Sequence, residues 1–202
     1  MIKESEIKKI LSTSLNIIVD TREQRNHIAE KFQGNRKQIR VIRRKLDFGD
    51  YSFELQPNSL TGEQIISFED LFAVERKYGE YENGGGFAEL RNNLTIGHDR
   101  IKREFKRAEI SNCNYLYLLL ENTKDENSIN NVPEPESING KRIITNEQYI
   151  KMYKSFINNR NMERIKAHLN PIRVINCMEY ESCKIIMTEF YKFFINFIGI
   201  IL

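Results

Sequence analysis

Four residues near the middle of the chain, Val74-Glu75-Arg76-Lys77, have the chemical groups that metal-dependent phosphodiester cleavage needs. In a strand, alternate side chains share a face, so Glu75 and Lys77 would point one way and Val74 and Arg76 the other. A carboxylate can hold a divalent ion, and a neighbouring ammonium can steady the attacking water or the developing negative charge. The alternative is a surface cross-strand pair, which contributes under about 1 kcal/mol.

Two more carboxylates stand at the ends of predicted strands. Asp20 closes the apolar run 16–20, at the carboxyl end of a strand, where open α/β sheets place their ligands. Asp50 follows Gly49 in a tight turn, and its strand should lie antiparallel to that of Glu75, which would bring both carboxylates within reach of one metal ion. Mg²⁺ takes oxygen ligands and keeps several waters, so two or three carboxylates suffice without histidine or cysteine. The alternative for Asp20 and Asp50 is helix or turn capping.

The elements that must position these residues follow from hydrophobic periodicity. The pattern predicts strands at 16–20, 40–46, 51–55, 65–68 running on through 72–77, 115–121 and 172–178. It predicts helices at 1–13, from 21 to about 32, at 87–94 and 98–110, within 146–169, and from about 181 to 197. Strands that alternate with helices, plus one antiparallel hairpin, indicate an α/β fold with a mixed sheet covered by helices on both faces. The glycine-rich segment 78–86 and the polar segment 122–140 are predicted to be flexible loops.

Composition bounds the class of protein. With 202 residues and 40% hydrophobic content, the chain can build the core of a single domain, 1–202. Its three cysteines, Cys113, Cys177 and Cys183, have no CxxC spacing, which argues against a disulfide framework or a zinc site and favours a reducing compartment. The amino terminus lacks the apolar region of a signal peptide, and the apolar stretch 190–202 is too short to span a membrane. We therefore expect a cytoplasmic protein without a membrane partner.

Basic residues are concentrated in two places although the net charge is only +3. Seven lie between Lys31 and Leu46, with no acidic residue among them: Lys31, Arg36, Lys37, Arg40, Arg43, Arg44 and Lys45. On the predicted helix 98–110, Arg100, Arg103 and Arg107 share one face. Both groups could contact a nucleic-acid backbone. The alternatives are a basic edge that blunts strand pairing and local pairing of the arginines with Glu104 and Asp99.

Four motifs in order carry a family resemblance: Ile18-Val19-Asp20-Thr21-Arg22-Glu23, Gly49-Asp50-Tyr51, Val74-Glu75-Arg76-Lys77, and a basic helix before a leucine-rich strand that ends in Glu121. Together they resemble the XPF-type structure-specific endonucleases, the excision-repair nuclease family that includes archaeal Hef. The family's nuclease motif is Gly-Asp, a spacer, Glu-Arg-Lys, three residues, then Asp. The resemblance covers about residues 15–195.

This resemblance implies a restriction-endonuclease-like core that uses Mg²⁺ or Mn²⁺ to cut one DNA strand near flaps, forks or junctions, in repair or recombination. By motif, Asp20, Asp50 and Glu75 would be metal ligands, and Lys77 the catalytic lysine. Arg22 and Arg76 would contact DNA, joined by Arg100 and Arg103 from the helix, with Glu23 in support. The family also implies a homodimer. The apolar excess of the last predicted helix fits a dimer, although core packing is the commoner cause.

Two features depart from the family pattern. Tyr81 stands where the Asp after Glu-Arg-Lys is expected, and the chain has no tandem helix-hairpin-helix module. We predict that Glu89, eight residues later, takes the place of this Asp, with 78–86 an inserted loop that bulges outward beside the DNA. Glu80 and Glu82 are rivals on a mobile segment, and Glu89 could instead favour its helix N-terminus electrostatically.

The first interpretation is therefore a metal-dependent DNA endonuclease that acts on branched or structured DNA. A second is a DNA-binding or scaffold partner that has lost catalysis, which the Tyr81 departure keeps open. A third is a nuclease of the same core with another role, such as restriction or mobile-element recombination. The abundance of Ile, Lys and Asn is typical of an AT-rich genome, such as that of a bacterium or phage.

Overall fold

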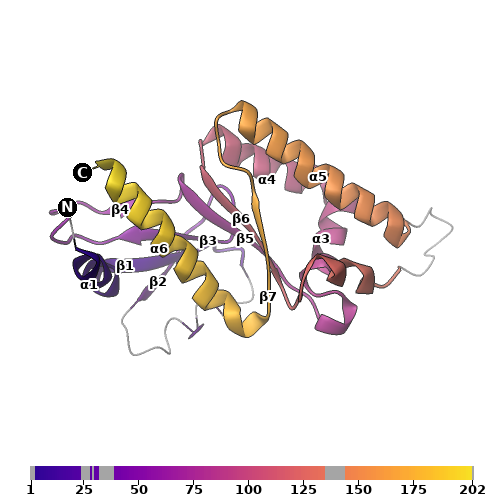
Figure 1. The fold of residues 1–202 in the computed structure, drawn as a ribbon, viewed down its shortest axis with the longest axis horizontal. Helices are drawn as coiled ribbons and strands as arrows, with labels where there is room; N and C mark the ends of the chain where they lie inside the picture. The colour runs from indigo at the N-terminus through magenta and orange to yellow at the C-terminus, as the bar shows by residue number, and fades with distance from the viewer. Residues whose placement is uncertain (1–2, 24–27, 29, 32–38, 135–143, 202) are drawn as a thin grey trace.

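A mixed seven-stranded β-sheet runs through the molecule (Figure 1). The computed structural model describes residues 3–23, 28, 30–31, 39–134 and 144–201. The strands are β1 (Leu15–Val19), β2 (Arg40–Arg43), β3 (Tyr51–Leu55), β4 (Ile66–Ser67), β5 (Phe72–Lys77), β6 (Tyr115–Glu121) and β7 (Arg173–Cys177). They lie in the order β2-β1-β3-β5-β6-β7, with β4 paired to β3. The α/β class and the mixed sheet are as predicted.

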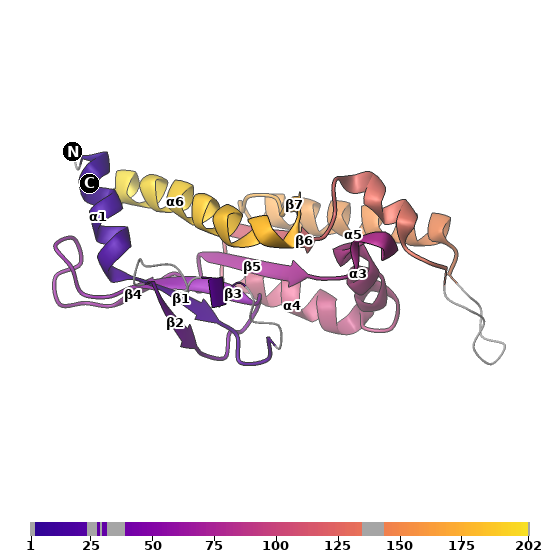
Figure 2. The same cartoon turned by 90° about the horizontal axis from the view of Figure 1, so that it is seen from below.

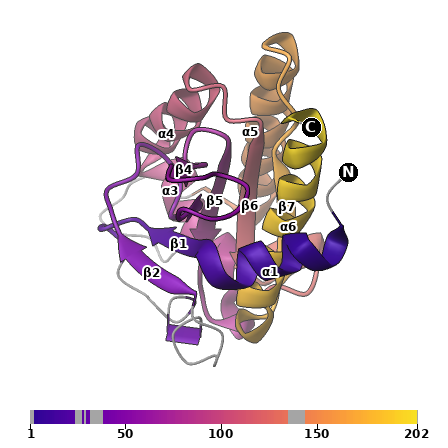
Figure 3. The same cartoon turned by 90° about the vertical axis from the view of Figure 1, so that its left-hand side faces the viewer.

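Helices cover both faces of this sheet. On one face lie α1 (Glu4–Ser14) and α6 (Ser182–Ile201), and on the other α3 (Gly86–Thr95), α4 (His98–Ile110) and α5 (Asn146–Lys166). Figure 2 shows α6 and α4 on opposite sides of β5, and Figure 3 shows α1 beside α6. Strand β6 explains the arrangement, because Tyr117 and Leu119 join the first core while Leu116, Leu118 and Leu120 join the second. A nearly continuous apolar run is what a strand covered on both faces requires.

Strand β3 is buried on both faces. All five of its side chains are buried, including Glu54. The Glu54 carboxylate accepts hydrogen bonds from Asn16 at 3.1 Å and from Arg44 at 2.8 Å. A polar residue can occupy this buried position because hydrogen bonds and charge pairing offset its desolvation.

The glycine-rich segment before α3 divides into an exposed part, 80–83, as the predicted outward bulge requires, and a packed part, 84–86, which corrects that prediction for the glycines. Its residues form η1 (Tyr81–Asn83), a single 3₁₀ turn, and then bury Gly84, Gly85 and Gly86. Gly85 has φ 56° and ψ −135°, and a Cβ there would lie 2.2 Å from the carbonyl oxygen of Asn122. The glycines therefore allow two backbone segments to approach closely.

The prediction of a flexible loop at 122–140 needs revision, and two other predictions fall partly outside the described residues. Within 122–140, residues Glu126–Asn131 form the 3₁₀ helix η2, capped by Asp125, and Ile129 is buried; residues 135–140 lie outside the described residues. Most of the helix expected from 21 to about 32, with His27, also lies outside them. So do Arg36 and Lys37 of the basic block.

Helix α6 uses most of its apolar surface within this chain. The buried side chains are Ile186, Phe190, Phe193, Phe194 and Ile198, and Ile185, Met187, Tyr191 and Phe197 pack against the same core. The apolar excess of this helix is thus largely explained by its own sheet and α1. None of the helices in the described part of the chain has the length and apolarity needed to cross a membrane.

Candidate active site

The ends of three neighbouring strands are tied together by hydrogen bonds around Asp50. The Asp50 carbonyl accepts from the backbone N–H of Asp20 at 2.9 Å, and the Asp50 N–H donates to the Val74 carbonyl at 2.8 Å. Its side-chain Oδ2 accepts from the backbone N–H of Arg76 at 2.7 Å. The antiparallel pairing of β3 with β5, at Tyr51 and Val74, brings this turn to the strand of Glu75 as predicted.

Strand alternation distributes the β5 side chains as expected. Lys77 Nζ lies 2.5 Å from Glu75 Oε1, so these two side chains share a face. Arg76 points to the other face, where it pairs with Glu23 and Glu121. Both β5 faces are buried, so Glu75 and Lys77 form a buried pair rather than the surface pair of the alternative.

Glu89 reaches this pair from the first turns of α3. Its Oε1 lies 3.3 Å from Lys77 Nζ, and its Oε2 accepts a hydrogen bond from the backbone N–H of Tyr78 at 2.9 Å. The rivals lie elsewhere: Glu80 accepts from Asn83 at 2.9 Å, and Glu82 is exposed on η1. The packed turn therefore brings the carboxylate of Glu89 beside Lys77.

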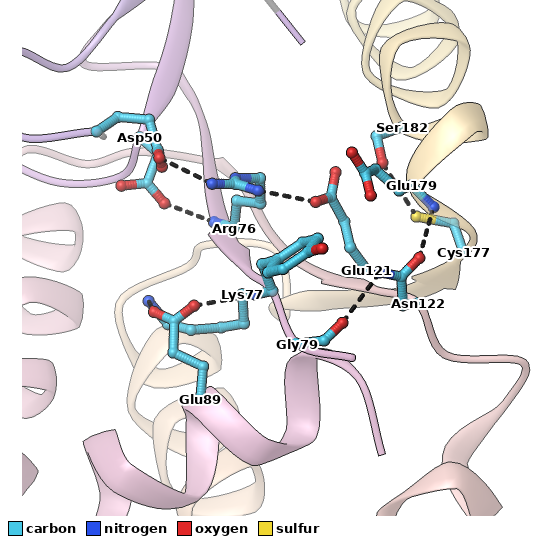
Figure 4. Close-up of polar contacts among 12 residues, drawn as sticks. Asp50, Arg76, Lys77, Gly79, Glu89, Glu121, Asn122, Cys177, Glu179 and Ser182 are labelled. Atoms are coloured by element: carbon cyan, nitrogen blue, oxygen red, sulfur yellow. Dashed lines mark hydrogen bonds and ion pairs between the residues drawn. The ribbon is translucent and has the colours of Figure 1, made fainter. Parts of the chain in front are cut away.

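These groups line one cavity of about 330 Å³. Its walls are Arg22, Glu23, Asp50, Glu75, Arg76, Lys77, Tyr78, Glu89, Arg100, Glu104 and Arg107. Figure 4 shows Lys77 and Glu89 turned toward one another, with Asp50 beside Arg76. Most of the residues singled out from sequence therefore meet in one polar cavity, contributed by β5, the Asp50 turn, α3 and α4.

Burial and charge shift the ionisation of the central groups. Burial, followed by the negative charge of Glu75, raises the pKa of Asp50 well above its usual value. Burial raises the pKa of Glu75 to about 7, although Lys77 opposes this shift. Burial lowers the pKa of Lys77, but the charges of Glu75 and Asp50 more than offset it, and the pKa ends above its usual value. The lysine is therefore a cation at neutral pH and cannot act as a proton acceptor.

The donor set fits a divalent cation with oxygen ligands. Glu75 Oε2 is buried and has no hydrogen-bond partner among the described residues, and the negative charge of Glu75 raises the pKa of Asp50. A cation would relieve both. No cluster of three or more His, Cys, Asp or Glu side chains arranged to hold a metal occurs within the described ranges. Two carboxylates are nevertheless a common protein contribution to Mg²⁺, which keeps waters and substrate oxygens as its other ligands.

Asp20 has a different environment from Asp50 and Glu75. It is not among the described residues that line the cavity. Its oxygens accept from Arg22 N at 2.7 Å, Arg22 Nε at 2.8 Å, Arg22 Nη2 at 2.9 Å and Leu46 N at 2.7 Å. Burial opposes its ionisation, but these bonds outweigh burial and lower its pKa. Its role as a metal ligand remains a prediction, and its observed contacts fix the Arg22 guanidinium beside the cavity.

The predicted DNA-contacting residues divide into two groups. Arg22, Arg76 and Arg100 line the cavity; Arg76 is buried on its two carboxylate partners, and Arg100 Nη2 donates to Asn93 at 2.9 Å. Arg103 is exposed on α4 and is not among the described cavity residues. In the basic block, Arg44 directly follows the edge strand β2. Its Nη2 lies 2.8 Å from Glu54 Oε2.

Two cavity residues, Glu104 and Tyr78, were not predicted as site residues, whereas Arg107 had been grouped with Arg100 and Arg103 on one helix face. Glu104 lies on α4 about one turn from Arg100, so helical spacing could have found it. Glu104 adds negative charge that acts on Glu75. Tyr78 follows Lys77 directly, and its ring lies 5.8 Å from the Arg76 guanidinium carbon. Sequence gave no reason to separate it from the glycine-rich segment.

Comparison with known proteins gives a family match and likenesses to solved structures. The model of the ERCC4 domain matches residues 19–198. Among solved structures, XPF from Aeropyrum pernix is similar over 86% of this chain and 62% of its own, with a TM-score of 0.47 and 17% identity. The chain thus spans less than two thirds of that protein's length. Curated proteins gave no match.

Proposed function

The chain belongs to the ERCC4-domain family, and from this premise we propose that it is a metal-dependent DNA endonuclease that hydrolyses phosphodiester bonds in branched or otherwise structured DNA. One observation carries the proposal. The buried Lys77 ammonium lies between the carboxylates of Glu75 and Glu89, at 2.5 and 3.3 Å, in a cavity that also holds Asp50. A scaffold without chemistry would gain nothing from burying these charges together, since burial of charge opposes folding unless it is compensated.

The residues take distinct roles in this proposal. Asp50 and Glu75 hold Mg²⁺ or Mn²⁺, with Asp20 as a further candidate ligand. When bound, the ion supplies Lewis acidity to the scissile phosphate. Lys77, which stays charged, donates a hydrogen bond to the attacking water or to the phosphate oxygen where negative charge develops. Glu89 orients the lysine from α3.

Arginines provide the attraction for the DNA backbone. Arg22 and Arg100 stand at the cavity, and Arg22 is 53% exposed although its guanidinium is anchored on Asp20. Arg103 extends the basic surface along α4. Phosphate contacts of this kind position the duplex and carry no sequence information, which is consistent with a substrate chosen by its structure.

The test is cleavage of labelled duplex, flap, fork and four-way-junction DNAs by the purified chain with Mg²⁺, Mn²⁺, Ca²⁺ or EDTA. We expect one strand to be cut near the branch with Mg²⁺ or Mn²⁺ and no cutting with EDTA. A protein that binds these DNAs without cutting any of them would favour the scaffold interpretation. Equal cutting of unbranched duplex would instead favour a nuclease with another role.

We also propose that the protein is a homodimer that works on the DNA of a bacterium or phage. The family resemblance supports this assembly, whereas the buried apolar face of α6 does not add to it. The solution mass at micromolar concentration tests the assembly, and a monomeric mass would refute it.

A further inference from the structure

Arg76 points to the face of β5 opposite to Glu75 and Lys77, where it is anchored by two carboxylates, and it also lines the cavity. Its Nη1 donates to Glu121 Oε2 and its Nη2 to Glu23 Oε1, both at 2.8 Å. The side chains of Arg76 and Glu121 are 4% and 0% exposed. Figure 4 shows the guanidinium between Asp50 on one side and Glu121 on the other. Glu121 is the last residue of β6, next to the partner of Lys77 in the β5·β6 register.

The backbone of Arg76 makes a separate contact with the site. Its N–H donates to Oδ2 of Asp50 at 2.7 Å, so the direction of that carboxylate depends on where the Arg76 peptide lies. Glu75 and Lys77 flank this peptide, and a shift of it would move both side chains. Arg76 thus connects the buried ion pairs with Glu23 and Glu121 to the carboxylate of Asp50, a candidate metal ligand.

We propose that Glu121 is a positioning residue for the candidate active site, acting through Arg76 to hold Asp50 in its orientation, with Glu23 as the second anchor. The inference rests on the proposed function. Glu121 itself is not among the described residues that line the cavity. A displacement of about 1 Å at reacting groups can lower a rate by about 10²-fold, so an anchor outside the cavity can control the chemistry inside it.

The competing explanation is that the Glu23–Arg76–Glu121 cluster only stabilises the fold. The two roles differ in what they change. A purely stabilising cluster affects the melting temperature and the folded fraction but leaves kcat per folded molecule and the affinity for metal unaltered. A positioning cluster lowers kcat and weakens metal binding in protein that is fully folded.

The experiment compares Glu121→Gln with a matched control in the full chain. Glu189 is suitable because it is also buried and pairs with two cations, Arg173 at 2.5 Å and Lys192 at 2.8 Å, outside the cavity. For each variant we would measure the melting temperature, kcat and KM on a branched DNA, and the Mn²⁺ concentration that gives half of the thermal stabilisation by metal.

Glu121→Gln should lower kcat at least about tenfold at little change in KM and should raise the Mn²⁺ midpoint several-fold. Glu189→Gln should alter only the melting temperature. In an Arg76→Met background, Glu121→Gln should cause no further loss, because both changes remove the same anchor. Equal kcat and equal Mn²⁺ midpoints in Glu121→Gln and wild type would overturn the inference. If the wild type cuts no DNA, the proposed function fails, and the Mn²⁺ midpoint alone decides whether Glu121 positions the site.

Discussion

The ammonium nitrogen of Lys77 lies 3.3 Å from Oε1 of Glu89, although the two residues belong to different elements, β5 and α3. The contact depends on the buried turn Gly84–Gly86, which sends the chain back toward the end of β5. Glu89 also fixes the Tyr78 N–H, the first peptide after Lys77. The structure thus brings Glu89 beside Lys77, and its substitution for the acid expected soon after Glu-Arg-Lys stays a prediction.

Glu89→Gln should slow cleavage by about 10- to 10²-fold. The change removes a negative charge beside Lys77 and loosens a contact that orients it, and misplacement of such a group is costly. Glu80→Gln and Glu82→Gln are matched controls from the same segment and should cut at the wild-type rate. The measurement is the single-turnover cleavage rate of each of the three variants, compared at equal folding stability. Equal rates in all three variants would mean that the site works with Asp50 and Glu75 alone.

Asp50→Asn, Glu75→Gln and Lys77→Ala should each abolish detectable cutting while DNA binding remains. Loss of one group that stabilises transition-state charge lowers kcat by about 10²–10³-fold. Removing either acid should tighten DNA binding slightly, because it lowers repulsion toward phosphate. Lys8→Ala, an exposed change on α1, is the control. Cleavage by Lys77→Ala at the wild-type rate would show that this lysine has no catalytic role.

Much of this site could be predicted because its geometry is local to a strand or a hairpin. Alternation along 74–77 separates Glu75 and Lys77 from Arg76, and a hairpin makes Asp50 a neighbour of Glu75. Both follow from the period of a strand and from short connections. The fold class was also predictable, because apolar runs such as 115–121 are visible directly in the sequence and mark strands that are buried on both faces.

The other features of the fold and of the site depend on packing, which hydrophobic periodicity does not encode. The glycines of 84–86 indicated flexibility, yet they allow close approaches to other segments, such as that of Gly85 to the Asn122 carbonyl oxygen. The metal-ligand role of Asp20 stays a prediction, but residue spacing does not reveal the four donors from Arg22 and Leu46 that set the direction of its carboxylate. Side-chain hydrogen bonds of this kind follow from tertiary contacts rather than from residue spacing.

The pH dependence of stability should reveal Glu75. Its pKa in the folded protein is about 7, above its usual 4.5. The folded state therefore binds this proton more tightly, so the stabilisation is complete below about pH 4.5 and is lost as the pH rises through about 7. In metal-free protein, the melting temperature of wild type should fall relative to Glu75→Gln between pH 5 and 8. A constant difference across this range would contradict the assignment.

The ionisation of Glu75 also predicts how the stabilisation of the protein by Mn²⁺ depends on pH. Because ligands must be deprotonated to bind a cation, the stabilisation of wild type by Mn²⁺ should increase from pH 5 to pH 8. Glu75→Gln should show a much smaller increase. Thermal melts with and without Mn²⁺ at each pH measure this directly. Equal stabilisation of both proteins by Mn²⁺ at pH 8 would indicate that the ion binds elsewhere.

DNA affinity should depend on Arg100 and Arg103 and should fall steeply with salt. Each phosphate that is neutralised contributes about 0.9 to the slope of log affinity against log salt for duplex DNA. The double variant Arg100→Ala/Arg103→Ala should flatten that slope by about 1.8 and weaken all sequences alike. Binding titrations at several salt concentrations, with Lys8→Ala as control, provide the slope. An unchanged slope would mean that Arg100 serves mainly its partner Asn93.

Gly85→Ala should strongly destabilise the fold and, with it, the position of Glu89. Gly85 has a positive φ of 56°, and an added Cβ would lie 2.2 Å from the Asn122 carbonyl oxygen and 2.5 Å from that of Glu121. Both atoms belong to backbone that cannot move without disturbing the end of β6. We expect a loss of roughly 3 kcal/mol or more, from backbone strain together with displacement of packed atoms.

Gly62→Ala is the matched control, because Gly62 has φ +62° with nothing within 4 Å of its Cβ position. That variant should lose about 1 kcal/mol, the cost of the left-handed conformation alone. Urea denaturation of both variants measures the difference, and similar losses in the two would show that the approach of Gly85 to β6 is not a tight constraint.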